Sequence, residues 1–166
     1  LTHAVEGYFS TKSNAFSDAL SLHSAKLIVE NIRTAVDNGK DVAARAVMLQ
    51  ASAMAITGFV SAMANIPIHN MAHTFGAKYG IPHGLANAVL MPIVLKNLPQ
   101  VYLPKVNGFA AALGVEANPN NPGETLDKCI EVISSLRDAV HLPADFSDYN
   151  ISSSDVPGLV PAVQND

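Results

Sequence analysis

The chain is poor in cysteine and in charged residues. Its 166 residues contain one cysteine, Cys129, so no disulfide can form within the chain. This suits a reducing compartment, and we expect a cytoplasmic protein. Only 14% of the residues are charged, the formal net charge is -4, and there is no basic run. Nucleic acid is therefore not an expected partner.

Several motifs of catalysis and targeting are also missing. The sequence has no HExxH motif of zinc hydrolases and no G-x-S-x-G motif. It has no P-loop either, because the glycines at Gly76, Gly80 and Gly84 lack the Lys-Ser/Thr pair that would hold phosphate. Residues 1–10 have neither the basic region nor the apolar core of a secretory signal peptide. The first residue is leucine rather than methionine, so we expect the chain to be a piece of a longer protein.

Charge is absent from a long stretch between Ala46 and Ala64. Its length is close to that of a membrane span. Glutamine, serine and threonine residues interrupt it, alanine dominates, and no aromatic belt flanks it. We therefore interpret this stretch as the central helix of a bundle, and no membrane is expected as a partner.

Apolar residues recur at helical spacing along most of the chain, and no segment alternates long enough to predict a sheet. Helices are predicted over residues 16–36, 41–65, 84–95, 109–113 and 124–140, with another beginning at Pro67 and a last one barely begun after residues 152–155. Gly7 is expected to end or loosen a short first helix, and Ser13 or Asn14 to cap the next one. Residues 96–105, with two prolines, are expected to form a kinked connection. The predicted fold is all-α, a helical bundle in one domain.

Three of the six histidines lie in one stretch, residues 66–90. His69 and His73 are four residues apart and share one face of a helix. Glycines and a proline then break the helical pattern before His83, at the start of the next helix. Such an arrangement can bring three imidazoles together around a divalent transition metal. The competing interpretation is a polar network that joins helices, and spacing alone leaves both open.

Two segments identify a family resemblance. LTHAVEGYFS at the start and IHNMAHTFGAKYGIPHGLANAVLMPIVLKN further on closely resemble the iron-containing (group III) alcohol dehydrogenases. The resemblance covers nearly the whole chain. It implies that residues 1–166 are the C-terminal helical, metal-binding domain of that dehydroquinate synthase-like fold. It also implies that the N-terminal nucleotide-binding α/β domain is absent from this chain.

The resemblance assigns roles to four histidines. It implies that His3, His69 and His83 bind a divalent metal, Fe2+ with Zn2+ as the alternative. His73 is implied to face the nicotinamide of NAD or NADP and to assist proton transfer. The family's fourth ligand, an aspartate, would precede Leu1. The implied substrate is a small alcohol or aldehyde, and the implied complete enzyme is a homo-oligomer, a dimer or larger.

Glu6 lies one helical turn after His3. It could replace the missing carboxylate ligand, but the resemblance treats it as a non-ligand. The alternative is that Glu6 orders the segment through contacts with the backbone or with a ligand.

Two other functions remain open at this stage. A metal-dependent hydrolase or lyase would need a carboxylate base beside the metal, which no motif supplies. A non-catalytic helical interaction domain would bind no metal and would expose an apolar patch.

Overall fold

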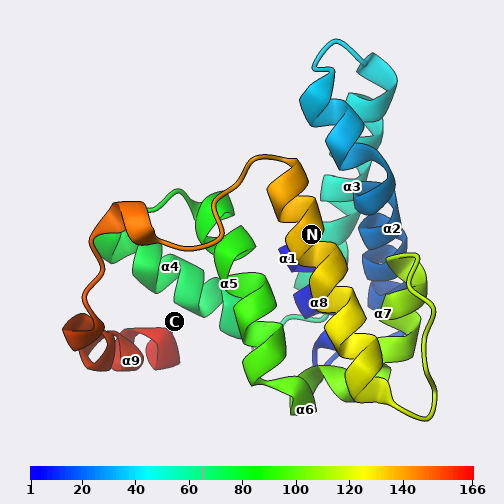
Figure 1. The fold of residues 1–166 in the computed structure, drawn as a ribbon. Helices are drawn as coiled ribbons and strands as arrows, with labels where there is room; N and C mark the ends of the chain where they lie inside the picture. Colours follow the sequence, from blue (N-terminus) through cyan, green and yellow to red (C-terminus); the bar gives the residue numbers. More distant parts are fainter. Residues whose placement is uncertain (65) are drawn as a thin grey trace.

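The structure, a computed structural model, describes residues 1–64 and 66–166, which form helices and no strand (Figure 1). The helices are α1 (Thr2–Phe9), α2 (Ala15–Asp37), α3 (Val42–Ser61), α4 (Pro67–Tyr79), α5 (His83–Asn97), α6 (Pro99–Tyr102), η1 (Leu103–Lys105), α7 (Val106–Ala112), α8 (Pro122–Ala139), η2 (Ser147–Tyr149), η3 (Ser153–Asp155) and α9 (Val156–Asn165). The predicted all-α fold is confirmed for these residues.

Local side-chain chemistry fixes several helix ends. The Asn14 side chain accepts hydrogen bonds from the backbone amides of Phe16 and Ser17, so of the two predicted caps it is Asn14 that begins α2. Asp41 begins α3 by accepting from the amide of Ala44. Pro67 occupies the first turn of α4, where its missing N–H costs nothing.

The prediction that Gly7 ends or loosens the first helix is wrong. Gly7 lies inside α1, which continues to Phe9. A Cβ atom at Gly7 would lie 2.9 Å from Ser21 Oγ of α2 and 3.1 Å from the backbone of Phe59 in α3. The glycine therefore serves close helix packing, a tertiary requirement that overrides its weak helix propensity.

Three other predicted boundaries need correction. Residues 96–105 are not a kinked connection, because each of their prolines sits in a first helical turn, of α6 and of η1. The helix predicted over residues 41–65 ends at Ser61, and Asn65 lies outside the described residues. The final helix is not barely begun, since α9 has ten residues.

The core surrounds α1. Phe9 packs edge-on against Tyr102 and Phe109, with ring centroids 5.0 and 5.3 Å away. Helices α2, α3, α4 and α5 all contact α1. Cys129 of α8 is fully buried in this core. Helices α4 and α9 lie side by side on one flank of the molecule, and α2 and α3 form a long hairpin on the other (Figure 1).

Helix α3 is long and apolar enough to cross a membrane by length and composition. Its inner face packs on α1 and α2, where Ala51 and Ala55 are buried. Its outer face exposes large apolar side chains, including Leu49 and Val60. The prediction that this helix packs in a bundle is therefore confirmed for its inner face. The prediction that it is the central helix is wrong, because none of the described residues covers its outer face.

Candidate metal centre

Four histidine rings from three helices gather at one place. His3 comes from α1, His69 and His73 from α4, and His83 from α5. The rings of His3 and His69 stack nearly parallel with centroids 4.6 Å apart. The His83 ring lies 5.4 Å from that of His69 and 5.2 Å from that of His73. The structure thus brings all four predicted site residues together, although they span 80 positions of sequence.

The rings differ in their access to solvent. His69 is buried, with 4% of its surface exposed, whereas His73 and His83 are more accessible. Phe59 at the end of α3 covers the His3 and His69 rings, with centroids 4.9 and 5.3 Å away. The site therefore has a dry inner side at His69 and an open side at His73.

Burial keeps two of the imidazoles neutral. It lowers the pKa of His3 to about 4, with the neighbouring His69 as the next cause. Burial also lowers the pKa of His83, again helped by His69. At neutral pH both rings are therefore uncharged, and the uncharged imidazole is the form that binds metals.

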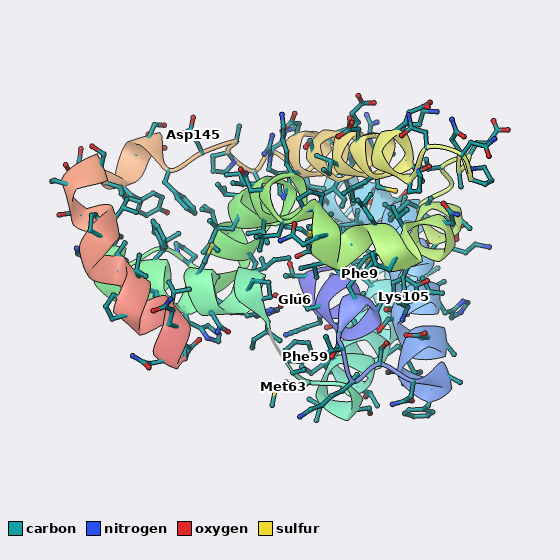
Figure 2. All side chains as sticks on the ribbon, turned by 90° about the horizontal axis from the view of Figure 1, so that it is seen from below. Glu6, Phe9, Phe59, Met63, Lys105 and Asp145 are labelled. Atoms are coloured by element: carbon teal, nitrogen blue, oxygen red, sulfur yellow. The ribbon has the colours of Figure 1, made fainter. Side chains whose placement is uncertain are left out.

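Glu6 links α1 to α4 beneath these rings. Glu6 is buried, with 3% of its surface exposed, and Figure 2 places it between α1 and the adjacent end of α4. Glu6 Oε1 accepts from the backbone amides of Ile68 at 2.7 Å and His69 at 3.4 Å. Glu6 Oε2 pairs with Nδ1 of His69. The interpretation that Glu6 orders the segment is thus confirmed.

Two further contacts were not predicted. The Asn87 side-chain amide lies 3.2 Å from His83 Nε2 and donates to the His83 carbonyl at 3.0 Å. This pair is four residues apart on α5, so helical spacing could have indicated it. His73 Nδ1 lies 2.7 Å from Asp166 Oδ2, and no local pattern could have indicated a contact across 93 positions.

A cavity of about 330 Å³ opens beside the rings of His3, His69 and His83. Its other walls come from α2, α3, α5 and α8 and are mostly apolar, with Ile28, Met48, Met91, Ile133, Leu136 and Val140 among the lining residues. A small molecule with an apolar portion could enter this space and reach the imidazoles.

The imidazole nitrogens of this cluster are chemically suitable ligands for a divalent transition metal. Imidazoles are favoured ligands of iron and zinc, and Glu6 holds the far nitrogen of His69 as a supporting carboxylate does at metal sites. Within residues 1–64 and 66–166, no group of three or more His, Cys, Asp or Glu side chains is arranged to hold an ion as the rings stand. The predicted ligand set, His3, His69 and His83, therefore stays a prediction.

Comparison with known proteins places the chain in one enzyme family. The chain matches the family described as Fe-containing alcohol dehydrogenase, C-terminal, over residues 1–166. It is 31% identical to lactaldehyde reductase of Escherichia coli K12, over 100% of this chain and 43% of that protein. It is 34% identical to 1,3-propanediol dehydrogenase of Klebsiella pneumoniae, over 95% of this chain and 40% of that protein.

Solved structures share the fold. A crystal structure of 1,3-propanediol oxidoreductase superposes with a TM-score of 0.93 at 32% identity, covering 99% of this chain and 43% of that chain. An alcohol dehydrogenase from Oenococcus oeni gives a TM-score of 0.91 at 26% identity, with the same coverage. The chain thus spans about two-fifths of the length of these relatives. It belongs to the iron-containing alcohol dehydrogenase family, whose C-terminal helical part it represents.

Proposed function

We propose that the protein containing this chain is an NAD(P)-dependent alcohol dehydrogenase of the iron-containing family. It would interconvert small alcohols and aldehydes or ketones by hydride transfer at a divalent metal. The observation that carries this proposal is the gathering of four histidine rings, His3, His69, His73 and His83, in a member of that family. Three of these rings, those of His3, His69 and His83, line one cavity. The named activities of its relatives, which act on lactaldehyde and 1,3-propanediol, support the substrate class.

We assign the metal to His3, His69 and His83, with Fe2+ as the ion and Zn2+ as the alternative. When bound, such an ion supplies Lewis-acid chemistry that polarises a substrate oxygen. The neutral state of His3 and His83 supports this assignment, because a protonated imidazole has no lone pair to offer. The buried position of His69 supports it too, since burial limits competition from water.

We assign His73 a different role, as the catalytic residue that moves a proton and faces the nicotinamide. It shares a helix face with His69 but is half-exposed on the open side of the site, and its ring stacks against His83 at 5.2 Å. A histidine with access to solvent can exchange protons with water, as a general acid or base requires.

Other parts of the proposal extend beyond these residues. The nicotinamide cofactor, NAD or NADP, would be held by an N-terminal α/β domain outside this chain. We expect this chain alone to be inactive for that reason. We also expect a homo-oligomeric enzyme in the cytoplasm, with no nucleic-acid or membrane partner.

The experiment is to purify the intact protein without chelators, measure its iron and zinc content, and assay alcohol-dependent reduction of NAD and NADP. The proposal predicts about one metal per chain and turnover that disappears when the metal is removed. Metal-free protein with full turnover, or metal-loaded protein with no turnover on any short alcohol, would contradict it.

A further inference from the structure

A single buried carboxylate connects the helix of His3 to the helix of His69. We propose that Glu6 is a positioning residue of the metal centre: it holds His69 with the Nδ1 hydrogen toward α1 and so leaves Nε2 free to bind the ion. This inference rests on the proposed function, because it concerns the same centre.

The two oxygens of Glu6 have separate partners. Oε1 accepts from the backbone amides of Ile68 and His69, which can only donate. Oε2 is left for His69 Nδ1. Because Glu6 is only 3% exposed, water cannot replace either partner without opening the core.

The backbone contact fixes the start of α4. That helix has no side-chain cap of its own, since its N-cap residue is Ile66 and Pro67 has no N–H. Glu6 supplies the missing acceptor from another helix, and a carboxylate at a helix N-terminus is also favourable electrostatically. The first turn of α4, which carries His69, is therefore attached to α1, which carries His3.

The side-chain contact fixes the tautomer of His69. A neutral imidazole has one N–H, and a carboxylate oxygen facing Nδ1 requires the hydrogen to be there. The lone pair then resides on Nε2. A carboxylate that accepts from the far nitrogen also makes the imidazole a stronger ligand.

Glutamine at this position cannot satisfy both partners. If its amide oxygen accepts from the α4 backbone, its NH2 group faces Nδ1 and drives the hydrogen of His69 to Nε2, where it blocks the metal. If the amide oxygen instead faces Nδ1, the NH2 group faces backbone donors. Glu6→Gln therefore changes the volume little but breaks one of the two contacts.

The test compares Glu6→Gln with a matched buried variant in the intact protein. Zn2+ affinity is measured by competition with a chelating indicator. We expect Glu6→Gln to weaken Zn2+ binding by about 10–100-fold. The control is Thr125→Val, which removes another fully buried polar group, bonded to Asn118 of the loop before α8. It should lower stability without changing Zn2+ affinity.

A second measurement needs no variant, so it applies even if Glu6→Gln fails to fold. Histidine nitrogen NMR of the Zn2+-loaded wild-type protein should find His69 bound through Nε2 with hydrogen on Nδ1. Binding through Nδ1 would overturn the inference. So would wild-type Zn2+ affinity in Glu6→Gln, or an equal loss of affinity in Thr125→Val, which would assign the effect to stability.

A third variant separates this inference from the proposed function. If His69→Ala retains the metal, the proposed assignment of the metal to His3, His69 and His83 is wrong. If His69→Ala loses the metal while Glu6→Gln keeps it, only the role of Glu6 is overturned.

Discussion

His69 and His73 are identical side chains on one face of α4 with different surroundings. His69 is buried against Glu6 and Phe59, whereas His73 is half-exposed. In the intact protein, His69→Ala should remove most of the bound metal, because too few donors remain. His73→Ala should keep the metal and lower kcat by about 10²–10⁴-fold, the usual effect of losing a proton-transfer group.

Metal content and pH–rate profiles of both variants decide this prediction. His23→Ala serves as the control, because His23 is an exposed histidine on α2 and does not line the cavity beside the rings. It should leave both measurements unchanged. Equal metal loss in His73→Ala and His69→Ala would make His73 a ligand and overturn the assigned roles.

Residue-level prediction succeeded where the partners are close in sequence. The spacing of His69 and His73 placed both on one helix face, and the predicted Asn14 cap formed. The pairing of Glu6 with His69 was not predictable from spacing, since it depends on how α1 packs against α4 across 63 positions. The family resemblance supplied His3 for the same reason, because no local pattern connects it to the other three.

Between α4 and α5, the chain reverses at Gly80, which has a φ of +69°. A Cβ there would meet nothing within 4 Å, so only the backbone conformation opposes a side chain. Gly80→Ala should lower the free energy of unfolding of this chain by about 1–2 kcal/mol. Gly39→Ala is the matched control, because it also has open space but no positive φ. Urea unfolding of both variants checks the difference, and equal effects would contradict it.

The contact between α1 and the α2–α3 hairpin depends on the absence of a side chain at Gly7. Gly7→Ala should cost about 1–3 kcal/mol, because Ser21 and the Phe59 backbone must move. Gly123→Ala, in the first turn of α8, places its Cβ at an ordinary 3.5 Å from Asn121 and should be neutral or stabilising. Thermal unfolding separates the two, and a harmless Gly7→Ala would show that the helices can part at low cost.

Element-level prediction was reliable for long amphipathic helices and poor for prolines and glycines. The helices predicted over residues 16–36 and 124–140 match α2 and α8 within two residues at each end. Proline can begin a helix as readily as it can end one, which explains the missed α6 and η1. The effect of Gly7 was mispredicted, because the atoms that require a glycine there belong to α2 and α3.

Across the whole molecule, apolar side chains differ sharply in what their burial contributes. Leu95 of α5 is fully buried, whereas Leu49 on the outer face of α3 is 74% exposed. In this chain Leu95→Ala should cost about 2–5 kcal/mol of unfolding free energy. The same substitution at Leu49 should cost less than about 0.5 kcal/mol. Urea unfolding compares them directly, and a similar cost at both positions would mean that the core extends over the outer face of α3.

The link between Glu6 and the start of α4 also has a consequence for the order of folding. The α2–α3 hairpin and the α4–α5 pair join neighbouring segments, so their contacts close short loops. The Glu6 contact closes a loop of more than sixty residues, which costs more chain entropy and favours late formation. We therefore expect the histidine cluster to be among the last features to assemble during refolding, after both helix pairs have formed.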